Sequence, residues 1–311
     1  MSTPLTVSTL SIGALRRVLR GPGLGVRAGT LGLRVFSSLS AVARGIHTLY
    51  SDYPLLEPDA FADFRVRVDG PPGPRRWLRP QAQFYLGRTA PFQPLPRHHA
   101  MAMLEWGVNW CVSSHLHRYL VLHAAAAERD GRTYLFPGAS GSGKSTLVAA
   151  LMFSGWRLLT DELVLLDLDT ETVKPFPRPL GLKNAAIHVI RRDFPPATLG
   201  EVVNDTSKGQ VAHLRPNARS VQQADLPGHI AGVVFPHYRA GARAELEEAH
   251  PADTFLALVN QSFNYQVLGE CAFRLLSSVV RRVPAYHVHY GTLDEGHGLI
   301  RKIDAQTSPP L

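Results

Sequence analysis

An eight-residue glycine-rich segment constrains this chain more than any other feature. It matches the pattern Gly-x-x-x-x-Gly-Lys-Ser without a mismatch, and it lies between a predicted apolar strand and a predicted helix. Its residues are Gly138, Ala139, Ser140, Gly141, Ser142, Gly143, Lys144 and Ser145. Glycines allow successive backbone N–H groups to turn toward a phosphate at the start of a helix. The sequence therefore predicts a phosphate-binding loop, and with it an α/β domain.

The side chains at the end of this segment indicate which ligand it binds. Lys144 supplies a compact positive charge for the β- and γ-phosphates of a nucleotide, and Ser145 supplies a hydroxyl for Mg²⁺. Thr146 follows within the first helical turn and completes the predicted nucleotide-binding set. We expect ATP and Mg²⁺ as the cofactors.

An acidic pair follows the next predicted strand. Asp161 and Glu162 lie just after Leu158-Leu159 and only 17 residues beyond Lys144, so one helix and one strand bring them back toward the loop. Two adjacent carboxylates allow one to hold the metal and the other to accept a proton from an attacking hydroxyl. The alternative is a strand end with solvated acids. The short interval and the absence of a Leu-Ser-Gly-Gly signature disfavour a transporter ATPase.

Other candidate site residues come from a histidine and two lysines. His123 precedes Lys144 by 21 residues in a predicted strand, where a histidine is either a core residue or a catalyst. Only five of the 33 basic residues are lysines, and four of these fall between residues 144 and 208. Because arginine meets the general need for positive charge here, Lys183 and Lys208 are candidates for contacts to the γ-phosphate or the substrate.

Composition narrows the function classes. The 45% hydrophobic and 19% charged content is that of a folded protein, and no 18-residue apolar run predicts a membrane span. The net charge of +8 is concentrated before Asp52, where six arginines stand without an acid, which disfavours a nucleic-acid footprint on the folded body. We expect this segment to be partly ordered rather than a cleaved transit peptide. The two separated cysteines indicate no disulfide framework and suit the cytoplasm.

Periodicity divides the chain into two expected domains. Alternation predicts strands at residues 64–68 and 83–86, and helical spacing predicts a helix from about 97 to 116. A hairpin over 119–136 turns at Asp130-Gly131, a helix spans 144–154, and strands follow at 156–159 and 163–166. A helix over 267–282 and a final strand over 285–290 close the chain. We expect a small α+β domain over 1–115 and an α/β phosphate-loop domain with a mixed sheet over 116–311.

The spacing of His123, the glycine-rich segment and the acidic pair resembles that in the catalytic core of HPr kinase/phosphorylase. His123, Lys144, Ser145 and Asp161 fall on functional positions of that family, and Glu162 replaces its second aspartate. The chain is more closely similar to the bacterial group called HprK-related kinase A. That second resemblance is carried by residues 103–111, 178–184, 206–209, 212–216 and 263–265.

The resemblance implies ATP- and Mg²⁺-dependent phosphorylation of a hydroxyl, with serine the expected acceptor, on a protein or peptide. It also implies a small peptide-chaperone domain of the pyrroloquinoline-quinone type encoded nearby, and it makes the N-terminal arginines part of the folded domain. Thr146 departs from the acidic residue usual in HPr kinases, and the acidic and glycine-rich segment of that family is not recognisable around 174–183. HPr itself and the reverse phosphorolysis are therefore not implied.

The combined interpretation assigns Lys144 and the loop amides to phosphates, Ser145 and Glu162 to Mg²⁺, and Asp161 to the role of general base. His123 is expected to hydrogen-bond or tune Asp161. Two alternatives stay open: a nucleotide-binding regulatory or assembly protein, and a kinase for a small metabolite. Neither a nucleic acid nor a membrane is an expected partner, and formation of a homo-oligomer is left open.

Overall fold

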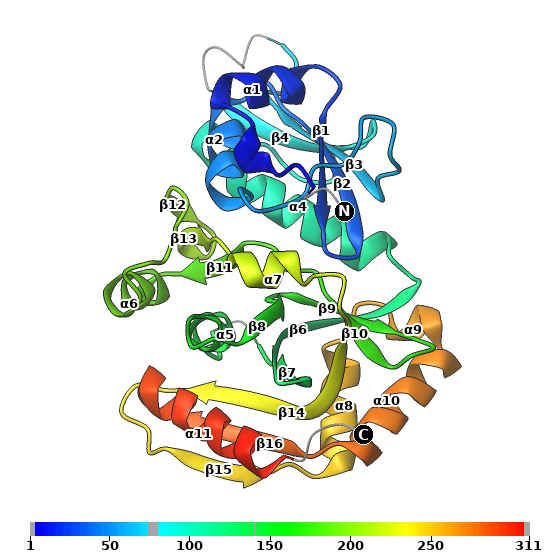
Figure 1. Cartoon of the computed structure of the whole chain (residues 1–311), viewed down its shortest axis with the longest axis vertical. Coiled ribbons are helices and arrows are strands. Elements are labelled where there is room, and N and C mark those ends of the chain that lie inside the picture. The colour runs from blue at the N-terminus through cyan, green and yellow to red at the C-terminus, as the bar shows by residue number, and fades with distance from the viewer. Residues whose placement is uncertain (1–3, 74–79, 140, 308–311) are drawn as a thin grey trace.

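The chain folds around two main β-sheets that lie one above the other along its longest axis (Figure 1). The computed structural model describes residues 4–73, 80–139 and 141–307. Helix α4 (Ala100–His115) lies on the side of the first sheet that faces the rest of the molecule (Figure 1).

The first sheet is built from the N-terminal part of the chain. In the described residues its strand order follows the sequence, β1 (Leu24–Ala28), β2 (Leu31–Phe36), β3 (Phe64–Asp69), β4 (Gln81–Leu86) and β5 (Leu95–Pro96). Strand β3 alternates between buried and exposed residues as its sequence predicts. Helix α4 packs against β3 and β4 so closely that a Cβ at Gly107 would lie 2.1 Å from the Phe84 ring. A 3-10 turn over Arg97–His99 replaces the predicted first turn of this helix.

The arginine-rich start is folded rather than partly ordered. Together with the first sheet and α4 it forms a unit that we call the first body. It contains a 3-10 turn (Val7–Thr9), α1 (Ile12–Arg20), β1, β2 and α2 (Ser40–Leu49). Helix α1 buries Leu15 and Leu19 in the core. Arg34 is itself buried and donates to the carbonyl oxygens of Glu57 and Ala60. The basic composition therefore conceals ordinary amphipathic helices and strands.

The second sheet is mixed, as the sequence predicts. Its strands are β6 (Tyr119–Arg129), β7 (Arg132–Pro137), β8 (Arg157–Thr160), β9 (Leu163–Asp167), β10 (Thr172–Lys174), β14 (Gly228–Tyr238), β15 (Glu245–Glu248) and β16 (Ala285–Tyr290). The neighbours β7, β14 and β16 are parallel, whereas β6 pairs antiparallel with β7, β8 and β9. Asp130 and Gly131 turn the β6–β7 hairpin with φ angles of 50° and 80°, the left-handed values that such a turn requires.

Helices cover both faces of the mixed sheet. Helices α5 (Lys144–Phe153) and α11 (Leu293–Gln306) pack on one face, and α8 (Pro251–Asn260) and α10 (Glu270–Arg282) pack on the other. Alternate residues of β6 enter the two cores, with Ala125 and Ala127 on the first face and Ala124 and Ala126 on the second. The core is therefore three-layered, and its sheet carries the predicted loop at one strand end.

The helix predicted over 267–282 is divided in two. Gly269, with φ 53° and ψ −119°, separates α9 (Tyr265–Leu268) from α10. That backbone geometry is not helical, so the long helix begins at Glu270 rather than at Val267. The predicted buried face is otherwise correct from Ala272 to Val279.

A small third sheet completes the fold. It contains β11 (Leu180–Lys183), β13 (Gly209–Leu214) and β12 (Val203–Thr206), with α6 (Ala185–Asp193) beside it and α7 (Ala218–Gln222) further along the chain.

The hydrophobic core of the first body also includes Val121, Leu163 and Phe176, so it extends past the predicted boundary at residue 115. The division into two domains stays a prediction. No helix in the described part of the chain is long and apolar enough to cross a membrane.

Candidate functional site

The glycine-rich segment connects strand β7 to helix α5, which begins at Lys144. Gly141 and Gly143 have φ angles of 91° and 93°, values that L side chains rarely adopt. At Gly143 a Cβ would also lie 2.4 Å from Tyr290 Oη and 2.8 Å from Tyr238 Cβ. Glycine is thus required there for both conformation and space. Ser140 lies outside the described residues.

Lys144 is only 6% exposed, at the first position of α5. Its ammonium group donates to the backbone carbonyls of Gly138 and Ala139, the latter at 3.2 Å. Burial lowers the pKa of Lys144, and the negative charges of Asp161 and Glu162 partly offset this effect. A desolvated cation is thus held against the glycine-rich segment.

Asp161 lies in the turn between β8 and β9 and is 5% exposed. Its Oδ2 accepts a hydrogen bond of 3.1 Å from the Gly181 N–H, whereas its buried Oδ1 has no hydrogen-bond partner among the described residues. Burial, and next the charge of Glu162, raise the pKa of Asp161 from 3.8 to about 6, although interactions with Ser145, Gly181 and Lys144 act in the opposite direction. Binding of a proton or a cation therefore stabilises this buried carboxylate.

This raised pKa predicts a dependence of stability on pH. Because the folded state binds the Asp161 proton more tightly than the unfolded state, the stabilisation is complete below pH 3.8 and is lost as the pH rises through about 6. Without metal, Asp161→Asn should be more stable than the native chain at pH 7.5 by about 2 kcal/mol. At pH 5 the difference in free energy of unfolding between the variant and the native chain should be smaller by roughly 1 kcal/mol. Urea unfolding of both proteins at the two pH values measures it, and identical pH dependence would contradict the assignment.

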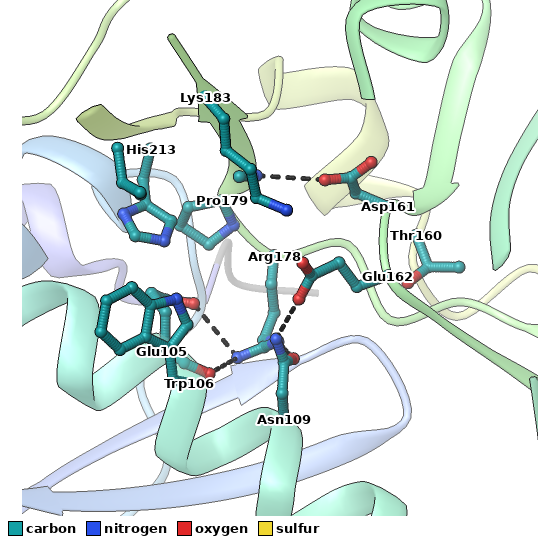
Figure 2. A pocket seen from close by; sticks show the side chains of 12 residues that line it. Glu105, Trp106, Asn109, Thr160, Asp161, Glu162, Arg178, Pro179, Lys183 and His213 are labelled. Carbon is teal, nitrogen blue, oxygen red and sulfur yellow. Dashed lines mark hydrogen bonds and ion pairs between the residues drawn. The ribbon is translucent and has the colours of Figure 1, made fainter. Parts of the chain in front are cut away.

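Glu162 is connected to the first body through a chain of side chains (Figure 2). Asn109 of α4 donates from Nδ2 to Glu162 Oε2, and its Oδ1 accepts from Arg178 Nη2. Arg178 pairs in turn with Glu105 Oε2 at 3.1 Å, and Glu105 is buried. Asn109, Arg178 and Glu105 are not among the individually predicted site residues. The signal available was the spacing of Glu105 and Asn109, which at i and i+4 share one helix face.

Strand register brings His123 to the same place. His123 lies opposite Leu163 on β9, and the next residue, Ala124, lies opposite Pro137, just before the glycine-rich segment. Its side chain hydrogen-bonds through Nδ1 to Gln261 Oε1 at 3.2 Å, not to Asp161 as expected. Burial, together with the charge of Lys144, lowers the pKa of His123. The imidazole is therefore neutral at pH 7.

These groups border a cavity of about 500 Å³. Its lining includes His123, Ala139, Gly141, Gly143, Lys144, Ser145, Thr146, Glu162 and Lys183. Asp161 instead lines a smaller adjoining cavity, which shares Glu162, Gly181 and Lys183 with the large one (Figure 2). Gly138 and Ser142 are part of the same loop, and the Ser142 carbonyl accepts from the Tyr238 N–H at 3.1 Å.

The two candidate lysines have different surroundings. Lys183, at the end of β11, lines both cavities. Lys208 lies in the turn between β12 and β13, is exposed, and places its Nζ 6.0 Å from the centre of the Trp106 ring. Lys208 lines neither cavity, so its predicted contact with the γ-phosphate or substrate gains no geometric support.

The donor set suits a hard divalent cation. Among the described residues, no group of three or more His, Cys, Asp or Glu side chains is arranged to hold a metal ion by itself. Mg²⁺, however, is commonly bound by one or two carboxylates together with substrate phosphates and water. The Glu162 carboxylate and the Ser145 hydroxyl both line the large cavity and fit that requirement, and the unpartnered buried Oδ1 of Asp161 adds negative charge near them.

Comparisons with known proteins find similarity among solved structures but not in sequence. No family model matches the sequence, and no curated protein matches it. Among solved structures, the Hpr(Ser) kinase/phosphatase from Coxiella burnetii is similar over 60% of this chain and 98% of its own, with 11% identity and a TM-score of 0.25. At this level of similarity the likeness carries no argument about function, which must rest on the site.

Proposed function

We propose that this protein is an ATP- and Mg²⁺-dependent kinase that phosphorylates a serine hydroxyl on a protein or peptide acceptor. The observation that carries the proposal is Asp161, a buried carboxylate with a pKa of about 6 beside Lys144 and Ser145. A general base works best when its pKa lies near the operating pH. A buried acid of this kind, next to a glycine-rich loop with positive φ angles, favours phosphoryl transfer over a purely structural role.

In this proposal the glycine-rich loop and Lys144 hold the triphosphate. Lys144 now donates to two loop carbonyls, and a triphosphate offers that ammonium stronger, charged acceptors. Ser145 and Glu162 would hold Mg²⁺, which when bound neutralises phosphate charge. Lys183 faces the same cavity and adds positive charge where phosphate oxygens would lie.

Asp161 accepts the proton of the serine hydroxyl as that oxygen attacks phosphorus and the bond from phosphorus to the ADP leaving oxygen breaks. His123 contributes a neutral imidazole at the cavity wall, fixed by Gln261. Because burial and the charge of Lys144 lower the pKa of His123, this imidazole adds no net charge to the site.

Gly143 offers a test of the loop itself. In Gly143→Ala the φ of 93° and the approach to Tyr290 Oη both oppose the methyl group, so we expect ATP affinity to fall at least about 10-fold. Gly155→Ala is the matched control, because Gly155 has φ 92° but open space around it and lies at the far end of α5. Calorimetric titration with ATP should separate the two variants. Equal affinities would argue against phosphate binding by this loop.

The direct experiment supplies candidate acceptors. The protein is incubated with γ-labelled ATP, Mg²⁺ and the products of adjacent genes, including any small peptide-chaperone-type protein, and phosphoserine is mapped by mass spectrometry. Label on a serine supports the proposal. Stoichiometric ATP binding without turnover in the presence of the acceptor indicates a regulatory or assembly protein, and turnover without any protein acceptor indicates a metabolite kinase.

We propose that the reaction takes place in the cytoplasm, where ATP is available and Cys111 and Cys271, both free thiols, stay reduced.

A further inference from the structure

We propose that Asn109 is a positioning residue, through which helix α4 of the first body holds Glu162 in the orientation required for metal binding. This inference rests on the proposed function. It assigns a role to a residue that lies before residue 116, outside the part of the chain that carries the glycine-rich loop and the acidic pair.

Both ends of the Asn109 amide are used, and each end fits one partner. The NH₂ group donates to the carboxylate of Glu162, and the carbonyl oxygen accepts from the guanidinium of Arg178 (Figure 2). The opposite orientation would place NH₂ against a cation and oxygen against an anion. The amide therefore has one stable direction, and it restricts the rotation of the Glu162 side chain.

The other end of this chain is anchored in the first body. Arg178 is 7% exposed, and besides Asn109 it bonds to Glu105 Oε2 at 3.1 Å and to the Glu105 carbonyl at 3.4 Å. Tyr50, the residue that follows α2, donates to Glu105 Oε1 at 2.7 Å. The Arg178 guanidinium also lies 4.9 Å from the centre of the Phe176 ring. Asn109 thus connects Glu162 to a buried ion pair with little freedom to move.

An amide between Arg178 and Glu162 has a consequence that a direct ion pair would not have. Arginine and a carboxylate tend to pair through both oxygens, which would neutralise Glu162 and occupy the atoms that a cation needs. Asn109 donates one hydrogen bond to Glu162 Oε2 and adds no net charge. Glu162 also lines the large cavity with Lys144 and Ser145, so it borders the space in which the phosphates and the cation would lie.

The test measures metal binding directly. Mn²⁺ is titrated into the protein with a non-hydrolysable ATP analogue, and free Mn²⁺ is followed by electron paramagnetic resonance. Asn109→Leu keeps the approximate shape but cannot donate, so we expect the Mn²⁺ dissociation constant to rise about 10-fold or more, as is usual when a residue orienting a metal ligand is lost. Nucleotide affinity without metal should stay unchanged.

Gln83→Leu is the matched control for lost stability. Gln83 is a buried amide of the first body, whereas Asn109 is partly buried; Gln83 bonds to the backbone of Phe84 and Phe92 and lines neither cavity. Both variants should lower Tm by a few degrees, because each removes hydrogen bonds that are at least partly buried. Only Asn109→Leu should weaken Mn²⁺ binding. Equal Mn²⁺ affinity in Asn109→Leu and the native protein, or equal weakening in Gln83→Leu, would overturn the inference.

Glu162→Gln separates this inference from the proposed function. If Glu162→Gln weakens Mn²⁺ binding and Asn109→Leu does not, the positioning role fails and the metal assignment stands. If neither variant weakens Mn²⁺ binding, Glu162 is not a metal ligand, and the metal site of the proposed function fails together with this inference.

Discussion

Replacing Lys144 with alanine should reduce the affinity for ATP–Mg²⁺ by at least about 10²-fold, because the phosphates lose the buried cation that lies at the start of α5 beside the loop carbonyls. The fold should survive. Since burial lowers the pKa of Lys144, its charged form is held at a cost in the folded state, so the loss of the ammonium should not lower Tm. Isothermal titration calorimetry with ATP and Mg²⁺ measures the effect.

Lys302→Ala is the control for a general loss of positive charge. Lys302 is an exposed lysine on α11, away from the cavity lining, and its removal should leave the affinity unchanged. Unchanged binding in Lys144→Ala would refute the nucleotide site, because the assignment of this loop depends on that cation.

The fold could be predicted from the sequence where local patterns decide it. The β6–β7 hairpin follows from Asp130-Gly131, and α5 follows from the glycine loop before it and its apolar residues. The order of strands across the mixed sheet could not be predicted. The pairing of β7 with β14 joins residues about a hundred positions apart, and periodicity along one segment contains no information about such a partner.

The site could be predicted only in part, for a related physical reason. A glycine loop and a nearby acidic pair are continuous in sequence, whereas the surroundings of each carboxylate are formed by distant segments. Asn109 bonds to Glu162 across 53 positions, and Gln261 bonds to His123 across 138. His123 and Asp161 lie in the same part of the sequence, which is why we expect them to interact. In the structure His123 bonds instead to Gln261, far from both in the sequence.

The roles that we propose for the two carboxylates follow from their environments rather than from their spacing. Asp161 is buried and has an unpartnered oxygen, and Glu162 is held by Asn109 and borders the large cavity. A raised pKa favours Asp161 as the proton acceptor, because a carboxylate with the usual pKa of 3.8 is a much weaker base at pH 7. Burial also keeps water from competing for the proton of the attacking hydroxyl.

Asp161→Asn should therefore keep ATP–Mg²⁺ affinity within a few-fold while acceptor phosphorylation falls by about 10²-fold or more, since a positioned general base contributes about 10²–10⁴-fold. Asparagine has nearly the same shape and can still accept from the Gly181 N–H of β11, so the turn between β8 and β9 should keep its position beside β11. In the native enzyme kcat/KM should rise with pH through about 6, because Asp161 must lose its proton to act. That dependence should disappear from the residual activity of the variant.

Glu162→Gln is the counterpart, and it should raise the Mg²⁺ concentration required for half-maximal activity. The two variants together assign the roles. If Asp161→Asn alters the Mg²⁺ requirement and Glu162→Gln abolishes transfer at saturating Mg²⁺, the roles are exchanged. If Asp161→Asn phosphorylates its acceptor at the native rate with the native pH profile, Asp161 is not the base. The proposed kinase mechanism then fails, because the buried carboxylate would serve only to stabilise the loop through Ser145 and Gly181.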